Sequence, residues 1–131
     1  MTAAFLLLAA VTFHQDVEPI LQKHCQVCHR PGEIGPMPLI TYPETRPWAK
    51  AIRQAVELKK MPPWFASAGG PFHNDSRLSD HEIATIKAWV EGGALKGPAK
   101  SAPVPVRWQE GWNIPSPDLV VTAPRPFPIP A

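Results

Sequence analysis

Three stretches of the chain repeat apolar residues at the spacing of an amphipathic helix. The first begins near Asp16, a good N-cap residue, and the second covers about residues 47–59. The third opens at Ser79 and Glu82, which have the offset of a capping box, and ends at Gly92. The residues predicted to share one face of each helix are Val17, Ile20, Leu21 and His24, then Trp48, Ile52, Ala55 and Val56, and finally Ile83, Ile86, Trp89 and Val90, the last four facing inward. The pattern predicts a mostly α-helical fold.

Proline and glycine interrupt this pattern and divide the chain. Residues 30–42 and 64–77 are rich in turn-forming residues and are predicted to be loops. The sequence contains 18 prolines, and half of them lie from Pro98 onward. We therefore expect one small helical domain over residues 13–97 and a Pro-rich, extended tail over residues 98–131.

The tail carries features that a solvated linker does not need. Trp108 and Trp112 are predicted to wrap back over the domain, although they could instead be presented to a partner. The run 119–121 has the composition of a short strand, and residues 124–131 are expected to be linker.

Residues 1–12 resemble a truncated secretory signal. The apolar run at positions 3–11 has the length of a signal-peptide core and is too short to span a bilayer. No Lys or Arg precedes it and the cleavage pattern is imperfect, so a buried N-terminal helix is the alternative. The formal charge of only +2 gives no indication of nucleic-acid binding. No stable membrane span is expected in the mature chain.

The chemistry is concentrated in Cys25-Gln26-Val27-Cys28-His29. Two thiols two residues apart, followed by an imidazole, have the pattern of a c-type haem attachment site. Each thiol can bond to one vinyl group of the porphyrin, which brings His29 under the iron as an axial ligand. A structural zinc site needs further ligands at similar spacing, and Cys25 and Cys28 are the only cysteines. A redox dithiol would be expected within a βαβ context, and a disulfide between the two cysteines is the remaining alternative. We expect one covalent haem c, and therefore an exported, periplasmic location.

The identity of the second axial ligand separates electron transfer from small-molecule chemistry. We favour Met61, because a whole helix separates it from His29 and lets the chain return on the opposite side of the haem. The other residues considered are Met37, His14, His24, His73 and His81, and Met61 could also be a core methionine. His24 is expected on the helix surface or beside the propionates.

Several further motifs resemble those of the monohaem class I cytochromes c. They are the haem motif, Gly35-Pro36, Met61-Pro62-Pro63 and the capped segment that leads from Leu78 to Val90. The resemblance implies a small helical fold around one haem and assigns Met61 as the second iron ligand. It also implies that the carbonyl of Pro36 accepts a hydrogen bond from the His29 ring. The chain resembles, more closely, cytochrome-like segments at the front of larger exported bacterial proteins, some of which continue into copper monooxygenase-like regions.

The expected function is that of a c-type cytochrome, an electron carrier rather than an enzyme, which passes single electrons between redox partner proteins outside the cytoplasm. Lys59 and Lys60, beside Met61, are candidates for steering an acidic partner. Two alternatives remain at this point. One is an electron-delivery module for a copper or other oxidoreductase, separate or downstream. The other is a five-coordinate haem peroxidase or gas-binding protein.

Overall fold

The computed structural model describes residues 10–66, 72–109 and 116–128. The helical elements are η1 (Phe13–Val17), α1 (Glu18–His24), α2 (Tyr42–Thr45), η2 (Arg46–Trp48), α3 (Ala49–Glu57), α4 (Asp80–Glu91) and η3 (Ala99–Ser101). The described residues contain no strand, so the mostly helical fold is confirmed, whereas the strand expected at 119–121 is not formed. None of the described helices is long and apolar enough to cross a membrane.

The first helix begins earlier than Asp16. Its first turn, η1, follows Thr12, and the Asp16 carboxylate accepts a hydrogen bond of 2.7 Å from the Thr12 backbone N–H. Asp16 therefore lies inside the helix and reaches back to its start. The first N–H groups of a helix have no acceptor within the helix. Here the N–H of Phe13 donates to the carbonyl of Leu95 at 2.8 Å, far along the chain.

The middle segment is divided into short helices. η2 is a 3-10 helix, which has fewer residues per turn than an α-helix and so changes the direction in which successive side chains point. Ala49, Ile52 and Val56 face the core as a result, while Trp48, predicted to share one face with Ile52 and Val56, is 45% exposed. α3 ends at Glu57, two residues before the predicted limit.

α4 matches its prediction closely. Ser79 is the N-cap, its hydroxyl accepts from Glu82 N–H at 3.2 Å, and the Glu82 carboxylate accepts from Ser79 N–H at 2.7 Å. Ile86 and Trp89 are fully buried, and Gly92 is the C-cap.

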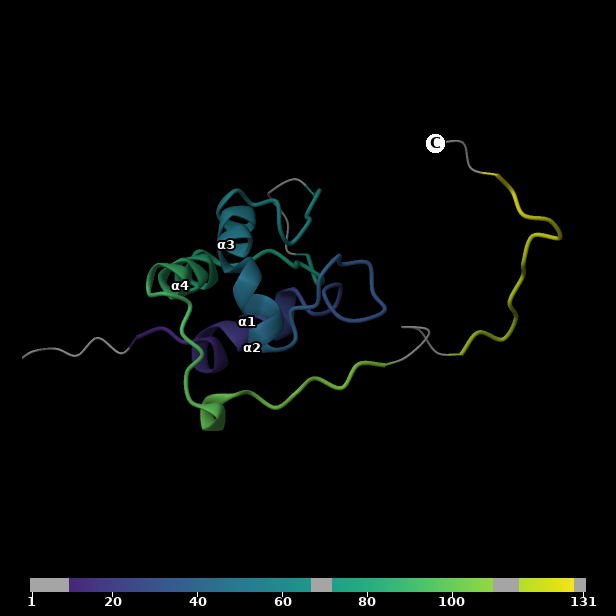
Figure 1. The fold of residues 1–131 in the computed structure, drawn as a ribbon. Coiled ribbons are helices and arrows are strands. Elements are labelled where there is room, and N and C mark those ends of the chain that lie inside the picture. The colour runs from purple at the N-terminus through teal and green to yellow at the C-terminus, as the bar shows by residue number, and fades with distance from the viewer. Residues whose placement is uncertain (1–9, 67–71, 110–115, 129–131) are drawn as a thin grey trace, which may run out of the picture.

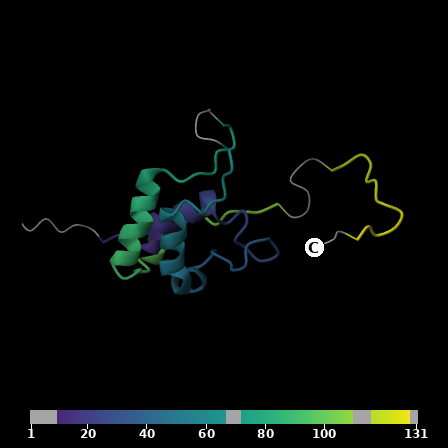
Figure 2. The same ribbon diagram turned by 90° about the horizontal axis from the view of Figure 1, so that it is seen from above.

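α4 packs against both α3 and η1 (Figures 1 and 2). The centre of the core is the contact of Phe13 with Trp89, whose ring centroids lie 6.0 Å apart. The buried apolar residues are Phe13, Val17, Ile20, Leu21, Leu39, Ala49, Ile52, Val56, Ile86, Trp89 and Ala94. These helical elements position residues 25–29, because α1 continues directly from η1 and has Cys25 as its C-cap.

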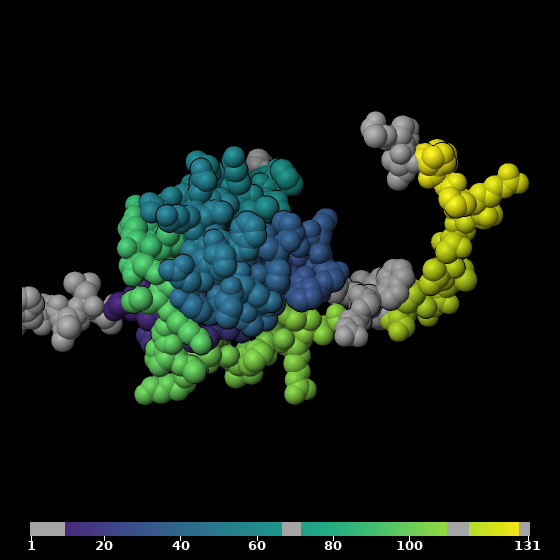
Figure 3. All heavy atoms as spheres, viewed as in Figure 1, coloured from purple at the N-terminus to yellow at the C-terminus, as the bar shows by residue number. Residues whose placement is uncertain are grey.

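The beginning of the tail lies against this helical body. η3 contacts η1, and in Figure 3 the yellow-green segment of the tail runs along the lower edge of the body. Residues 116–128 are almost all exposed. Residues 1–9, which hold most of the predicted signal, and Trp112 lie outside the described residues.

Candidate functional site

Cys25, Cys28 and His29 lie on one turn that follows α1. Backbone N–H groups of Cys28 and His29 donate to the carbonyl of Cys25 at 3.1 and 2.8 Å. Both cysteines are free and partly buried. The helix thus ends in a compact turn that carries two thiols and an imidazole.

The two thiols have different surroundings. The Cys25 side chain packs against the hydrophobic core. Burial raises the pKa of Cys25 to about 12, with further contributions from Cys28 and the Glu82 carboxylate. Cys25 is therefore a protonated thiol at neutral pH.

The His29 ring is held by the loop that follows the motif. Its Nδ1 lies 3.0 Å from the carbonyl oxygen of Met37, which can only accept, so Nδ1 carries the proton. The resemblance had indicated Pro36 as the acceptor, and the structure shows the next residue instead. A proton on Nδ1 leaves the lone pair on Nε2, which is the form of imidazole that binds a metal.

Three further hydrogen bonds fix the loop against the turn. Gly35 N–H donates to the Cys28 carbonyl at 2.8 Å, and Leu39 N–H donates to the His29 carbonyl at 2.9 Å. The buried Gln26 side chain, between the two cysteines, donates to the Leu39 carbonyl at 2.9 Å. Leu39 is itself part of the core, so the position of the His29 ring is tied to the packing of the domain.

Gly35 allows this approach of loop and turn. A Cβ at position 35 would lie 2.6 Å from the Cys28 oxygen and 2.8 Å from Nδ1 of His29. Both distances are below van der Waals contact. The Gly35-Pro36 pair was singled out in the sequence, and the structure assigns the steric requirement to the glycine.

Met61 lies on the segment after α3 and is 43% exposed. It borders a pocket of about 650 Å³ between α1, α3 and α4. The apolar part of the lining is formed by Val56, Met61, Pro62, Trp64, Ala66, Leu78 and Ile83. The contacts of the described residues do not join Met61 to His29, so the structure places Met61 at a pocket without pairing the two predicted ligands.

The other ligand candidates have different environments. Met37 packs against the core, and His73 and His81 are exposed. His14 lies 2.7 Å from the Glu18 carboxylate, with 13% of its side chain exposed. Among the described residues no three His, Cys, Asp or Glu side chains gather into a donor set for a metal ion.

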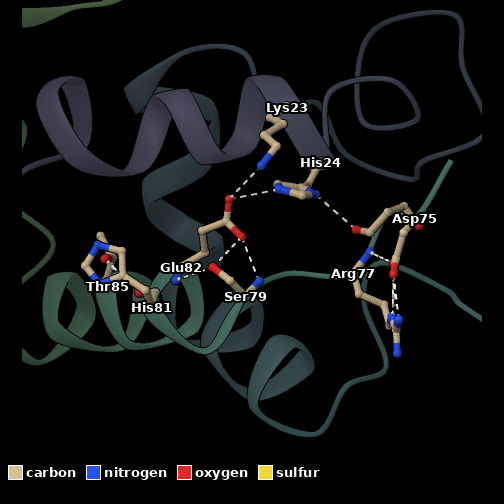
Figure 4. A network of polar contacts seen from close by, with 9 residues as sticks. Lys23, His24, Asp75, Arg77, Ser79, His81, Glu82 and Thr85 are labelled. Carbon is tan, nitrogen blue, oxygen red and sulfur yellow. Dashed lines mark hydrogen bonds and ion pairs between the residues drawn. The ribbon is translucent and has the colours of Figure 1, made fainter. Parts of the chain in front are cut away.

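His24 was predicted on the surface or near the propionates, and it is buried. Its Nδ1 lies 3.0 Å from the Ser76 carbonyl oxygen and its Nε2 lies 3.0 Å from Oε1 of Glu82 (Figure 4). Lys23 reaches the same carboxylate oxygen at 3.2 Å. This cluster joins the end of α1 to the start of α4 next to Cys25, and sequence reasoning missed it because the partners are more than 50 positions apart.

The Glu82 carboxylate is stabilised as an anion. Burial opposes its ionisation, but hydrogen bonds from Ser79, His24 and Lys23 outweigh burial and lower the pKa to about 2. Glu82 therefore completes the capping box of α4 and is at the same time the anionic partner of Lys23 and His24 on α1.

Trp64 is a second feature that the sequence did not reveal. Its indole borders the Met61 pocket and packs edge-on against Phe72, with centroids 5.3 Å apart. The Nε1–H group is buried and has no acceptor among the described residues.

No family model, curated protein or solved structure matches the chain.

Proposed function

We propose that this chain is a c-type cytochrome that carries single electrons through one covalent haem. The observation that carries the proposal is the turn after α1, where Cys25, Cys28 and His29 are grouped and Met37 accepts from Nδ1 of the imidazole. That arrangement leaves Nε2 of His29 available to iron. Within the described part of the chain no residue forms a hydrogen bond with Nε2. The grouping fits the chemistry of the attachment site better than that of a zinc site or a redox dithiol.

The cysteines would hold the cofactor by thioether bonds. Cys25 and Cys28 would each add their S–H group across one vinyl group of the haem, the sulfur to one carbon and the proton to the other. When bound, the haem iron would supply the one-electron redox couple.

Met61 is the proposed second axial ligand. It borders the pocket between α1, α3 and α4, and its chain segment is anchored to α3 by the Lys60 N–H group, which donates to the carbonyl of Ala55 at 2.9 Å. A thioether ligand favours ferrous iron and suits a carrier of relatively high reduction potential. Exposed Lys59 and Lys60 stand beside it and are proposed to attract an acidic redox partner outside the cytoplasm.

The test begins with covalent attachment. The full chain is produced with an export signal peptide in a host that attaches haem c. The amount of haem that stays bound to the protein after denaturation is then measured. We expect one haem per chain, and none in the Cys25→Ala, Cys28→Ala double variant. A parent protein without covalent haem would contradict the proposal.

Met61→Ala tests the second ligand, with Met37→Ala as the matched control. The oxidised parent is expected to show the weak long-wavelength band of methionine-bound ferric haem, and only Met61→Ala should abolish it. If the band is missing from the parent, the open-face alternative, a peroxidase or gas-binding protein, is favoured. If the band survives Met61→Ala, the ligand assignment is wrong.

A further inference from the structure

The outward face of α1 is covered by the first part of the tail. Glu18 and Gln22 of α1, together with Gln26 and Arg30 of the turn that follows it, form a row of polar residues four positions apart that borders one cavity. Gln22 Nε2 donates to the Val104 carbonyl at 3.1 Å. Pro105, Val106 and Trp108 face the same row across a cavity of about 720 Å³. The tail therefore runs beside the helix that carries the haem motif.

Arg30 stands at the end of this row, directly after His29. One of its terminal nitrogens donates to the Val27 carbonyl at 2.6 Å and to the Gln26 carbonyl at 3.3 Å. The other pairs with the Glu33 carboxylate at 2.6 Å. Carbonyl groups at a helix end have no N–H donor within the helix. The Arg30 guanidinium is the donor to the carbonyls of Gln26 and Val27, the two residues between the cysteines. Only 11% of the Arg30 side chain is exposed, although it lies at the surface.

Trp108 lies against this guanidinium. The Arg30 Cζ atom is 4.4 Å from the centroid of the Trp108 ring, well within the range of a cation–π contact. The arginine is thereby restricted on both sides, by the turn carbonyls and Glu33 on one and by the indole on the other. A free arginine has many rotamers, and the indole removes part of that freedom.

We propose that Arg30 and Trp108 are positioning residues for the Cys25–His29 turn, and that residues 98–109 form a strap that belongs to the haem site. The strap holds the Arg30 guanidinium against the carbonyls of Gln26 and Val27. The Cys25–His29 turn then sets the direction of the His29 ring. The link to haem rests on the proposed function, whereas the link to the turn does not.

Amide hydrogen exchange on the full chain, as purified from the exporting host, tests the strap. In Trp108→Ala the amides of Cys28 and His29 are expected to exchange roughly 5- to 30-fold faster, the factor that corresponds to a partly desolvated cation–π contact. The amides within α4 should be unchanged. Trp108→Phe keeps an aromatic face and should restore most of the protection, whereas Arg30→Lys lacks the planar fork and should not.

Val104→Ala is the matched control in the same segment. Its side chain is 86% exposed and its backbone carbonyl remains available to Gln22, so exchange at the turn should not change. The double variant Arg30→Ala, Trp108→Ala should exchange no faster than Arg30→Ala alone, because the two residues act as one unit. In the haem-loaded protein Trp108→Ala should also shift the reduction potential, and Trp108→Phe should bring it back.

The proposal is overturned if the turn amides are unaffected by Trp108→Ala, if they are unprotected in the parent, or if α4 amides accelerate equally. Failure of Trp108→Phe to restore protection would overturn it as well. A parent without covalent haem would contradict the proposed function, and the exchange data would still decide on the strap.

Discussion

At the scale of single residues, Gly35 connects the Cys25–His29 turn to the loop that orients His29. The Gly35 N–H group donates to the Cys28 carbonyl, and the absence of a Cβ atom at this position leaves room for the His29 imidazole. Proximity of this kind is invisible in a local sequence pattern, which indicates only a turn at Gly35-Pro36.

Gly35→Ala should displace the imidazole, because the new methyl group would overlap both the Cys28 oxygen and Nδ1 of His29. We expect a loss of about 1–3 kcal/mol in the free energy of unfolding, measured in urea, together with a weaker iron–histidine bond seen in the haem spectrum. Gly32→Ala is the control, since its methyl group meets nothing within 4 Å and only the positive φ of 84° resists it. If both variants lose the same stability and neither alters the spectrum, the steric role assigned to Gly35 is incorrect.

Glu82 gives the domain a defined acid response. Its pKa is about 2 in the folded protein and 4.5 in an ordinary glutamate, so the unfolded chain binds its proton more readily. The stability that Glu82 contributes is complete above pH 4.5 and is lost progressively as the pH falls toward 2.

Glu82→Gln should therefore flatten this acid branch of the stability curve. We expect about 1–2 kcal/mol lower stability at pH 7, from weaker capping and lost partners of His24 and Lys23, and a smaller difference from the parent at pH 2. Urea unfolding at intervals between pH 7 and pH 2 measures both. A constant difference across that range would contradict the assignment. His81→Gln, on the same helix but exposed, is the control.

At the scale of elements, α3 and α4 end in the same way with different residues. In each, the last turn is closed by a pair of Schellman hydrogen bonds. The residue with positive φ in this motif is Lys59 after α3 and Gly93 after α4, where Ala94 follows with a φ of 53°. Lys59 has a φ of 54°, which costs an L-residue about 1–2 kcal/mol.

Lys59→Gly should consequently stabilise the protein by about 1 kcal/mol, despite the greater freedom of glycine in the unfolded chain. Lys60→Gly removes the same charge one residue later, at a position without positive φ, and should be neutral or destabilising. Thermal unfolding of the two variants compares them directly. Equal shifts for both would show that charge, and not backbone conformation, dominates at this helix end.

The elements that the sequence predicts well are those with local signals. α4 begins at its capping box and ends at its glycines because every partner lies within a few positions. The start of the first helix was misjudged, since the free amides of η1 are satisfied by Leu95 and Lys96, about 80 residues away. Trp48 was misplaced because a 3-10 turn shifts the helical phase, and apolar spacing alone does not reveal such a turn.

At the scale of the whole molecule, the tail has two parts with different expected contributions. Residues 98–109 contact η1, Gln22 and Arg30, while residues 116–128 are almost all exposed. The sequence predicted that Trp108 and Trp112 wrap back over the domain and that residues 124–131 are linker.

Deleting residues 98–131 should lower the free energy of unfolding by about 2 kcal/mol, because a hydrogen bond and a cation–π contact are lost. Deleting only residues 116–131 should change it by less than about 0.5 kcal/mol. Urea unfolding of the haem-loaded forms provides the comparison. If the shorter deletion is as harmful as the longer one, the stabilising contacts lie in the distal part of the tail.

The sequence by itself determined the helical class, the caps of α4 and the grouping of Cys25, Cys28 and His29, because these depend on neighbours along the chain. It also pointed to haem c, to Met61 and to electron transfer, which stay predictions. Only the tertiary structure decided that Met37 accepts from His29, that His24 is buried against Glu82 and that Trp108 covers Arg30. The physical reason is the same in each case. These contacts join residues that loop geometry and core packing bring together, and no spacing in the sequence encodes the path by which the chain returns.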